Sequence, residues 1–502
     1  MWSFGNAFSW IRTCARSVRQ RRLLGSLLEP RPEIAKVTAK KDVPTVAKNR
    51  ILMLLENLPF PQDVRVRREA YALSSAGYLV TVICPSAKGQ PSREVINGVH
   101  VYRYPAPAPG HGFLSYLWEY MYSMAASFTL SLVALFRKGF DVIHAHNPPD
   151  TFVFLALFFK MFGKRFVYDH HDLAPEMYLA RFRHGVNTMV YRALVWLEKL
   201  SCRCANHVIV TNESYKKLAI ERGRVPQSRI TIVRNGIELS RVMVPVAPDH
   251  ALRQMGKTII GYIGVMGFQD GVDYLLRALD YMVRRLRRTD FYCVLIGFGD
   301  ALESLKTLAR ELGLQDYVRF TGPVFGENLR KLLAAADICV DAAPANPYND
   351  RSTMFKIMEY MSLGKPIVAF DLPEHRFTAR GAAVYVTPND ERAFAKALTQ
   401  LMDDPQRRMA LGNFASGRIK TQLAWDYSIP NLLAAYRAIL PEAKVPEAQN
   451  PYLPAPSLQT SFTFGVPEIP HASKQDTLLA QANVPADELQ ASEPPAREVQ
   501  SN

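Results

Sequence analysis

Cysteine is scarce in this chain, and its copies are scattered. Only Cys202 and Cys204 lie close together among the six cysteines in 502 residues. Their CxC spacing matches neither a redox CxxC motif nor a zinc-binding knuckle, so no disulfide framework or structural zinc site is indicated. The pattern is typical of reduced structural thiols in a cytosolic protein. The remaining cysteines are Cys14, Cys84, Cys293 and Cys339.

Acidic residues are absent from the first 28 positions, which contain five arginines. Arg12, Arg16 and Arg19 share one face of a helix, so a basic helix lying on an anionic membrane surface is one interpretation. The segment lacks the uninterrupted apolar region of a secretory signal. An organellar transit peptide and a solvated leader also fit this composition.

The overall composition, by contrast, is that of a globular protein. Hydrophobic residues make up 48% and charged residues 21%, which excludes a wholly disordered or fibrous chain. The net charge of +15 suggests nucleic acid, an anionic membrane or phosphorylated small molecules as partners. Residues 441–502 hold ten prolines, eight acidic and three basic residues, a composition that predicts a disordered tail.

Short β-rich runs alternate with helical-period segments between residues 50 and 440. This pattern predicts two α/β domains, each a doubly wound parallel sheet, with ligand at the carboxyl ends of the strands in the crevice between them. We expect a leader at 1–48, a first domain at 49–238, a linker at 239–256, a second domain at 257–440 and the tail at 441–502. The predicted strands are 51–55, 80–84, 141–144, 166–168, 207–210, 230–233, 259–263, 292–296, 318–320, 338–340, 367–370 and 383–386.

One long run, Phe113 to Phe136, contains a single charge, Glu119. It is long enough to span a bilayer, but a spanning helix at this position would split the first sheet. We therefore expect a domain helix that is either buried or has an outer face touching lipid, and a transmembrane helix is the third alternative.

The segment NDRSTMFKIMEYMSLGKPIVAFD at 349–371 carries the most chemistry. Ser352 or Thr353 is expected to cap a helix that Gly364 ends. Free amides at the helix start can hold a diphosphate. Residues 351 and 356 add positive charge, and Glu359 can accept hydrogen bonds from ribose hydroxyls. An ordinary surface helix fits the same spacing.

This segment resembles the donor-binding helix of family 4 glycosyltransferases, retaining enzymes with two Rossmann-like domains in the GT-B arrangement. The resemblance implies transfer of a sugar from a nucleoside diphosphate sugar to a hydroxyl acceptor, without a cofactor or metal. The motifs that match, in the family's order, are HAHNPPD (144–150), YDHHDLAPE (168–176), TNES (211–214), VRNG (233–236), GYIGVMGFQDG (261–271), IGFGD (296–300) and FTGPV (320–324).

Two departures from the family pattern concern phosphate binding. The first of the two family glutamates is replaced by Arg351, and the loop from Gly264 to Gly271 lacks the usual Arg and Lys. We infer that Arg351 and Lys356 grip the phosphates from the helix start, and that Arg351 stabilises the leaving diphosphate. The resemblance further places Asn235, Gly264, Gly267, Gly297, Phe298, Ser352, Thr353 and Glu359 at the donor, although the glycines also fit simple tight turns.

The candidate residues of the first domain follow its strands. Asp63 and Arg65 come after the first strand, where they contact acceptor or donor phosphate or form a structural salt bridge. His171 matches the family histidine that binds the donor sugar and steadies the developing charge, and His170 and Asp172 flank it on the acceptor side. His144 and His146 have an HxH spacing that suits a metal, but structural packing explains them better and no metal is expected.

The acceptor is less constrained than the donor. A basic leader and an apolar helix suit an anionic membrane and a lipid-linked saccharide, as in bacterial surface polysaccharide assembly, and so predict a cytoplasmic protein held at the inner face of the membrane. A soluble acceptor, a sugar-nucleotide epimerase or hydrolase, and an inactive scaffold remain alternatives. No nucleic-acid recognition module is recognisable, so nucleic acid is not expected as a partner.

Overall fold

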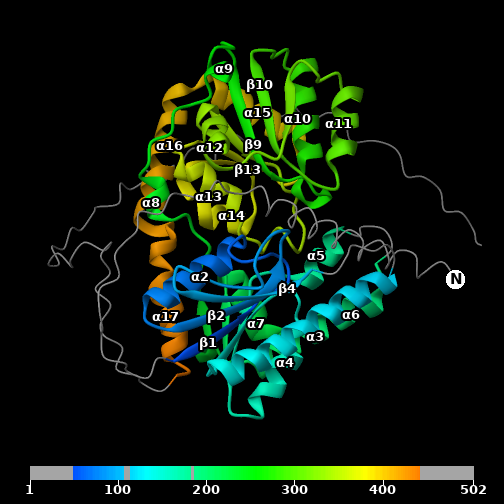
Figure 1. Cartoon of the computed structure of the whole chain (residues 1–502). Helices are drawn as coiled ribbons and strands as arrows, with labels where there is room; N and C mark the ends of the chain where they lie inside the picture. The colour runs from blue at the N-terminus through cyan, green and yellow to red at the C-terminus, as the bar shows by residue number, and fades with distance from the viewer. Residues whose placement is uncertain (1–48, 107–112, 182–185, 441–502) are drawn as a thin grey trace, which may run out of the picture. The chain divides into compact units, whose positions relative to one another are not determined.

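The computed structural model describes residues 49–106, 113–181 and 186–440 (Figure 1). Within these ranges the chain forms two sheets, each covered by helices on both faces. The prediction of an α/β fold with two Rossmann-like, doubly wound sheets is confirmed. The leader at 1–48, for which a membrane-surface helix was one interpretation, and the tail at 441–502, expected to be disordered, lie outside the described residues.

In the described part of the chain the first sheet has eight strands in the order β3-β4-β2-β1-β5-β6-β7-β8. The strands are parallel except β3, which runs antiparallel to β4. Their bounds are β1 Arg50–Leu54, β2 Leu79–Ser86, β3 Arg93–Ile96, β4 Val99–Pro105, β5 Val142–His146, β6 Arg165–His170, β7 His207–Val210 and β8 Ile230–Ile232.

The second sheet has six described strands, all parallel, in the order β11-β10-β9-β12-β13-β14. Each strand predicted from the β-rich runs overlaps a strand of one of the two sheets. The bounds are β9 Thr258–Val265, β10 Phe291–Phe298, β11 Val318–Gly322, β12 Ile338–Asp341, β13 Ile367–Phe370 and β14 Ala383–Val386.

Helices connect the strands. Before β9 they are α2 Val64–Ser75, α3 Phe113–Arg137, α4 Phe152–Lys160, α5 Ala174–Arg181, α6 Thr188–Cys204, α7 Glu213–Glu221, α8 Leu239–Val242 and α9 His250–Arg253, with the short turn η1 Gln227–Arg229. After β9 they are α10 Val272–Arg284, α11 Leu302–Glu311, α12 Gly326–Ala335, α13 Phe355–Ser362, α14 Pro373–Ala379, α15 Glu391–Asp403, α16 Pro405–Arg418 and α17 Ile429–Arg437, with the short turns η2 Phe268–Asp270, η3 Arg380–Ala382 and η5 Trp425–Tyr427 and the π-helical segment η4 Ile419–Leu423.

Each sheet separates two apolar cores, because successive side chains of a strand point to opposite faces. In β1, Leu52 and Leu54 belong to the core beneath α4 and α6, whereas Ile51 and Met53 belong to the core beneath α2. A strand buried on both faces must be apolar throughout. This is why continuous apolar runs located the strands.

The edge of the first sheet was not predicted. Strands β3 and β4 form a hairpin whose turn residues Asn97 and Gly98 both have positive φ angles, of 47° and 82°. Asn-Gly is favoured in such two-residue turns. The alternation of exposed and half-buried residues in β3 is weak as a sequence signal because the strand is only four residues long.

The last helix, α17, lies outside the second sheet although its sequence falls within 257–440. Leu432, Ala435 and Tyr436 pack in the core between the first sheet and α2. The side chain of Asn431 also donates a hydrogen bond of 3.0 Å to the carbonyl of Ile232 in β8. Figure 1 shows α2 and α17 on the same side of the first sheet. A helical period cannot indicate which of two sheets a helix will cover.

Helix α3 corresponds to the long apolar run between 113 and 136. In the described part of the chain no helix has the length and apolar character required to cross a membrane. The helix buries Ser123, Ser127 and Ser131, while Met121 and Phe136 are exposed. The helix is therefore a domain helix with one side packed in the core and an exposed outer surface, and contact of that surface with lipid stays a prediction.

Candidate active site

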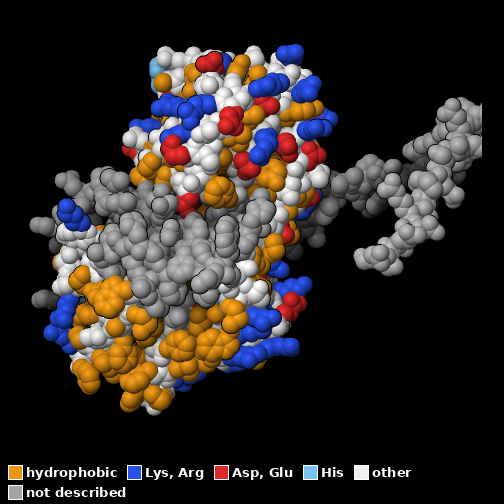
Figure 2. Space-filling model, turned by 90° about the vertical axis from the view of Figure 1, so that its right-hand side faces the viewer, with side chains coloured by type: hydrophobic (Ala, Val, Ile, Leu, Met, Phe, Trp, Pro, Cys, Tyr) orange, Lys and Arg blue, Asp and Glu red, His pale blue; other side chains and the backbone are white. Residues whose placement is uncertain are grey.

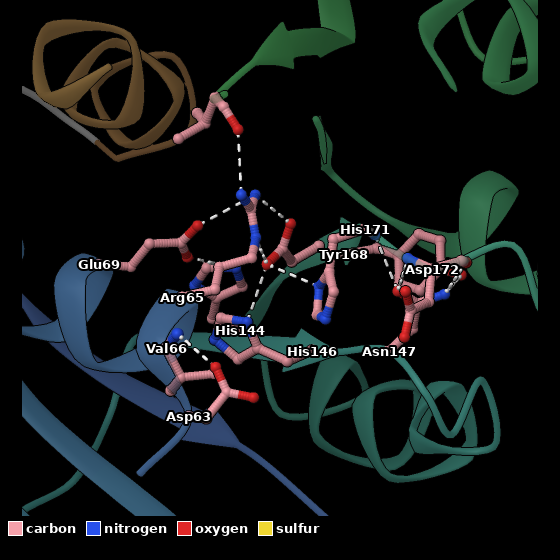
Figure 3. A network of polar contacts seen from close by, with 12 residues as sticks. Asp63, Arg65, Val66, Glu69, His144, His146, Asn147, Tyr168, His171 and Asp172 are labelled. Carbon is pink, nitrogen blue, oxygen red and sulfur yellow. Dashed lines mark hydrogen bonds and ion pairs between the residues drawn. The ribbon is translucent and has the colours of Figure 1, made fainter. Parts of the chain in front are cut away.

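The carboxylate of Asp169 is the centre of a buried polar network at the carboxyl ends of β5 and β6 (Figure 3). The guanidinium of Arg65, from α2, donates two hydrogen bonds of 2.7 Å to it. Oδ2 of Asp169 also lies 2.9 Å from Nδ1 of His146 and 3.1 Å from Nδ1 of His171. One carboxylate thus orients two imidazoles, and sequence reasoning had identified only the imidazoles.

Arg65 is held on several sides. Besides Asp169, it contacts Oε1 of Glu69 at 3.0 Å, the carbonyl of Val233 at 3.1 Å and Oδ1 of Asn235 at 2.9 Å. Both Arg65 and Glu69 are buried. The structure therefore supports a structural salt bridge for Arg65. The hydrogen bond from Arg65 also shows that Asn235, expected at the donor, lies beside this network.

Asp63, predicted to act with Arg65, has a different task. It is the N-cap of α2, and its Oδ1 atom accepts a hydrogen bond of 2.9 Å from the amide of Val66. Aspartate is favoured at this position because it satisfies an amide that the helix leaves unpaired. Asp63 begins the helix that carries Arg65.

Charge pairing and burial shift the pKa values of this network. Burial opposes ionisation of Asp169, but Arg65 and then His171 hold its pKa well below its usual range. Burial also opposes protonation of His171, yet the charge of Asp169 raises the pKa of this histidine. Burial raises the pKa of Glu69 to about 8, against the influence of Arg65. The carboxylates of Asp169 and Glu69 are therefore ionised over very different pH ranges.

His144 links the network to α17. The hydroxyl of Tyr436 lies 2.7 Å from Nδ1 of His144, and burial keeps the pKa of the tyrosine well above its usual range, so the hydroxyl donates. Burial and then neighbouring His146 hold the pKa of His144 well below its usual range. Its Nε2 atom lies 3.8 Å from Oε2 of Glu69. This supports the structural interpretation of His144.

The same residues meet the geometric requirement for a metal site. Candidate ligand atoms of Glu69, His144, His146 and Asp169 all lie within 4.8 Å of one another. The guanidinium of Arg65, however, already lies between the two carboxylates, at 3.0 and 2.7 Å. A cation placed among these ligands would meet the fixed positive charge of Arg65. The donor set is therefore already charge-balanced by the chain itself.

His170 does not share the environment of His171, whereas Asp172 lies close to it. His170 is buried, stacks on Tyr168 with ring centroids 5.4 Å apart, and places Nε2 at 3.5 Å from Glu198. Its side chain points to the opposite face of β6 from Asp169, as alternation requires, so it lies outside the Asp169 network, and its acceptor-side role stays a prediction. The amide of Asp172 donates to Oδ1 of Asn147 at 3.0 Å, which fixes the loop after His171.

On the second sheet, Lys356 is the charged residue nearest the start of α13. Its Nζ atom lies 3.4 Å from both Asp270 and Asp341 and 3.3 Å from the hydroxyl of Tyr262. Burial lowers the pKa of Lys356, but Asp341 and its other neighbours raise it well above the usual range. Lys356 is therefore charged and largely balanced by two carboxylates that sequence reasoning had not included.

The predicted cap of the donor helix is wrong. Helix α13 begins at Phe355, its N-cap is Met354, and no side chain caps it in the described structure. The hydroxyl of Ser352 instead donates to the carbonyl of Tyr348 at 2.8 Å. Local turn bonding by the segment before the helix competes with capping by this hydroxyl.

Arg351 and Thr353 contact the first half of the chain. The side chain of Asn212 donates to the carbonyl of Arg351 at 2.8 Å and to Oγ1 of Thr353 at 2.9 Å. The guanidinium of Arg351 donates to the carbonyl of Pro347 at 2.6 Å. The segment before α13 is therefore one place where residues of the two halves of the chain meet.

A second set of contacts joins the same two regions. Glu374, at the start of α14, accepts a hydrogen bond of 2.7 Å from the hydroxyl of Ser214 and lies 3.7 Å from Arg234. Its other oxygen lies 3.4 Å from Oγ1 of Thr353. Asn212, Ser214 and Arg234 belong to the TNES and VRNG motifs. These motifs therefore position the segment before α13.

Glu359 lies on α13 with its carboxylate 3.8 Å from a nitrogen of Arg241. Burial raises the pKa of Glu359, against the influence of Arg241. The expectation that this carboxylate binds ribose hydroxyls stays a prediction.

The glycines of the second sheet lie where two strands end side by side. Gly264 of β9 pairs with Gly297 of β10. Gly297 has a φ of 141°, and a Cβ atom there would lie 1.9 Å from the carbonyl oxygen of Gly264. The amide of Gly267 donates to Asp270 at 3.1 Å. These glycines thus let the loop pack closely, and Phe298, half-buried, ends β10 beside them.

Sequence signals existed for some of the missed residues. Asp169 and Asp341 are the acidic residues at the carboxyl ends of the buried strands β6 and β12, a position where ligands bind in open α/β sheets. Asp270 lies within the GYIGVMGFQDG motif. Tyr436 and Glu374 carry no local signal, because their partners are far away in sequence.

Comparison with known protein families supports the division of the chain into two halves. Residues 62–236 match the model "Glycosyl transferase 4-like domain", and residues 257–404 match "Glycosyl transferases group 1". The two matches fall on the first and the second sheet respectively.

Three individual proteins illustrate the similarity. An uncharacterized glycosyltransferase of Methanocaldococcus jannaschii is 25% identical over 69% of this chain and 86% of its own. A D-inositol 3-phosphate glycosyltransferase of Corynebacterium urealyticum is 25% identical over 75% of this chain and 90% of its own. The structure of Anabaena HepE in complex with UDP-glucose superposes with a TM-score of 0.58 at 17% identity, over 77% of this chain and 99% of that one.

Proposed function

Because the chain is a glycosyltransferase of the GT-B fold, we propose that it moves a sugar from a nucleoside diphosphate sugar to a hydroxyl acceptor with retention of the anomeric configuration. The observation that carries the proposal is the contact of Asn212 with Arg351 and Thr353. This contact brings the acceptor half against the segment that precedes α13, the proposed donor helix.

The donor binds at the second sheet in this proposal. The amides at the start of α13 and the charges of Arg351 and Lys356 stabilise the diphosphate, and Glu359 accepts from the ribose. Gly264, Gly267, Gly297, Phe298, Ser352 and Thr353 shape the surrounding loops, and Asn235 approaches from the first half. The complex of the related fold with UDP-glucose supports a nucleotide sugar as donor.

His171 acts on the sugar. Its Nδ1 atom is directed at Asp169, which leaves Nε2 as the ring nitrogen for a hydroxyl of the donor sugar. The raised pKa of His171 supports a positively charged side chain that stabilises the leaving diphosphate. No metal and no cofactor takes part, and Arg65 supplies the positive charge beside Asp169.

Retention proceeds by front-face substitution in this mechanism. A double displacement needs a carboxylate free to attack the sugar. Asp169 is held by two hydrogen bonds from Arg65, and Glu69 is buried with its pKa raised to about 8. Neither suits a nucleophile. The leaving diphosphate then accepts the proton of the acceptor hydroxyl on the same face of the sugar.

The acceptor we propose is a lipid-linked saccharide of surface polysaccharide biosynthesis, used by a cytoplasmic enzyme at the inner face of the membrane. The exposed apolar residues of α3 support this acceptor over a soluble one. A phosphorylated soluble acceptor is the second candidate, because a relative is named a D-inositol 3-phosphate glycosyltransferase.

The test is turnover with a panel of UDP-sugars and GDP-sugars, each with lipid extract, with inositol phosphate, and with no acceptor. We expect nucleotide release that depends on lipid extract, and an NMR spectrum of the product that shows the donor's anomeric configuration. An inverted product would overturn the mechanism. Equal release without acceptor would indicate a hydrolase, and failure to bind any donor would indicate an inactive scaffold.

A further inference from the structure

Large apolar side chains gather on the outer surface of three helices that are distant in sequence. On α3 these are Trp118, Met121 and Phe136, and on α4 and the turn after it they are Phe154, Met161 and Phe162. On α6 they are Met189 and Trp196. Together these eight residues, each between 46% and 84% exposed, form what we call the apolar face.

The apolar face is continuous across the helices. The rings of Phe154 on α4 and Trp196 on α6 lie 6.4 Å apart, and the rings of Phe128 on α3 and Phe158 on α4 lie 5.0 Å apart beneath. Figure 2 shows apolar side chains side by side over this part of the first half of the chain. Soluble proteins rarely expose a contiguous apolar patch of this kind without a partner.

Helix α3 carries large apolar residues on its outer surface as well as on the side that packs against the protein. The serines 123, 127 and 131 are buried against the protein, and the hydroxyl of Ser131 is satisfied by the carbonyl of Ser127 at 2.7 Å. Trp118 and Phe136, by contrast, are 65% and 84% exposed. The helix therefore packs apolar side chains such as Phe128 inward and still leaves large apolar residues on its outer surface, where an apolar partner would cover them.

The fully exposed charged side chains on the elements that carry the apolar face are basic. Arg137, Arg165, Arg192 and Arg203 are exposed on α3, β6 and α6. Among described residues 118–181 and 186–204, every acidic side chain is buried or half-buried. An anionic surface satisfies this pattern. A second copy of the chain would instead bring the same arginines towards one another.

We propose that the apolar face docks on an anionic lipid bilayer. Trp118, Trp196 and the Phe and Met side chains enter the interfacial region, where such side chains are favoured. The four arginines bind lipid phosphates around it. The biological purpose of this docking would be to bring the enzyme to a lipid-linked acceptor, and that part of the inference rests on the proposed function. Binding to the bilayer itself requires neither donor nor acceptor.

The test is flotation of the full chain with phosphatidylcholine vesicles and with vesicles that contain phosphatidylglycerol, in the absence of any sugar. We expect binding to the anionic vesicles that weakens with salt. Trp196→Gln and Phe162→Ser should each weaken vesicle binding roughly tenfold. A tenfold change corresponds to about 1.4 kcal/mol of binding free energy, which the lost burial of apolar surface accounts for. Arg192→Gln should weaken vesicle binding roughly fivefold, the effect of about 1 kcal/mol per basic residue at the surface.

Matched controls come from α16 in the second half. Met409→Gln removes a 64% exposed methionine, and Arg407→Gln removes an exposed arginine. Both should bind vesicles like the wild type. Circular dichroism of every variant checks that the fold is intact.

Three results would overturn the proposal. The first is a wild type that does not float with anionic vesicles. The second is that the variants of the apolar face bind anionic vesicles as well as the wild type does. If deletion of residues 1–48 then abolishes binding, the membrane contact lies in those residues and not in the apolar face. The third is that the variants of the apolar face change the oligomeric mass measured by sedimentation but leave vesicle binding unchanged. That result would mean that the apolar face binds a second copy of the chain. Loss of glycosyl transfer with vesicle binding intact would count against the proposed function alone.

Discussion

The Nδ1 atom of His171 lies 3.1 Å from the Oδ2 atom of Asp169. The same oxygen accepts a hydrogen bond from Nε of Arg65 at 2.7 Å, so the position of the histidine depends on an arginine from α2. The orientation of the candidate catalytic imidazole is therefore a property of the whole network.

Replacing His171 should affect the reaction more than donor binding. For His171→Ala we expect kcat to fall by about 100-fold or more, the range for loss of a positioned acid or base, while the Kd for the nucleotide remains within about twofold. Steady-state kinetics and calorimetric titration with the best donor of the panel measure both. His250→Ala, at an exposed position on α9, is the control. An unchanged kcat would exclude His171 from catalysis.

Removing Arg65 should destabilise the fold. In Arg65→Met the ionised Asp169 would remain buried without its partner, which costs about 3–5 kcal/mol in the free energy of unfolding. Urea unfolding followed by fluorescence measures the change. Arg277→Met breaks the exposed pair of Arg277 with Asp273 and should cost less than about 1 kcal/mol. Similar losses in both variants would show that the buried network contributes little.

Glu69 should make stability fall as the pH rises. Its pKa is raised from an ordinary 4.5 to about 8 in the folded state, so folding favours the protonated carboxyl. Its contribution is therefore complete below about pH 4.5 and is lost by about pH 8. The raised pKa of His171 has the same effect. Its contribution to the free energy of unfolding is also lost as the pH rises above 6.5, the ordinary pKa of histidine.

Glu69→Gln separates these two contributions, because it keeps a neutral side chain at every pH. We expect urea midpoints between pH 5 and pH 8 to decline less in the variant than in the wild type, with the part due to His171 remaining. Glu303→Gln, on the exposed surface of α11, should leave the wild-type decline unchanged. Parallel curves for Glu69→Gln and the wild type would contradict the raised pKa.

The positive charges near α13 should hold the diphosphate. Arg351→Ala and Lys356→Ala are each expected to raise the Kd for the nucleotide sugar about 10-fold to 100-fold, since a charge-assisted hydrogen bond contributes about 1.5–3 kcal/mol. Isothermal titration measures this. Lys331→Ala, on the exposed face of α12, is the control. Wild-type affinity in both site variants would mean that the phosphates are bound elsewhere.

Helix α17 should depend on its contact with His144. Tyr436→Phe removes the hydroxyl that donates to Nδ1 of this histidine and leaves a buried acceptor unpaired, at a cost of about 1–3 kcal/mol in the free energy of unfolding. Tyr427→Phe removes an exposed hydroxyl bonded to the carbonyl of Lys420 and should change stability by less than about 0.5 kcal/mol. Equal stability of Tyr436→Phe and the wild type would refute the contribution of this bond.

Local sequence patterns were sufficient for most of the fold. The buried strands were found because residues covered on both faces must be apolar, and the turn and helix signals between them predicted parallel sheets. The hairpin of β3 and β4 was missed for two reasons. The four-residue edge strand at Arg93–Ile96 is only partly buried, so its pattern is weak, and in the buried strand β4 the polar residues His100 and Arg103 interrupt the apolar run.

The candidate site was predicted only in part. The motif with His171 and the segment before α13 were found from their residue types and positions after strands. The contacts of Arg65, His170 and Ser352 were not, because each depends on partners that a local pattern does not contain. Ser352, for example, bonds back to Tyr348 instead of capping α13.

The sequence by itself determined twelve of the fourteen described strands, the helical segments between most of them and the identity of the charged residues. Only the tertiary structure decided which charges meet: Arg65 with Asp169, 104 positions away, Asn212 with Thr353, 141 positions away, and Tyr436 with His144, 292 positions away. The apolar face likewise exists only once α3, α4 and α6 lie side by side. Periodicity reports the environment along one element, whereas electrostatic and apolar contacts depend on distances between elements, which folding alone sets.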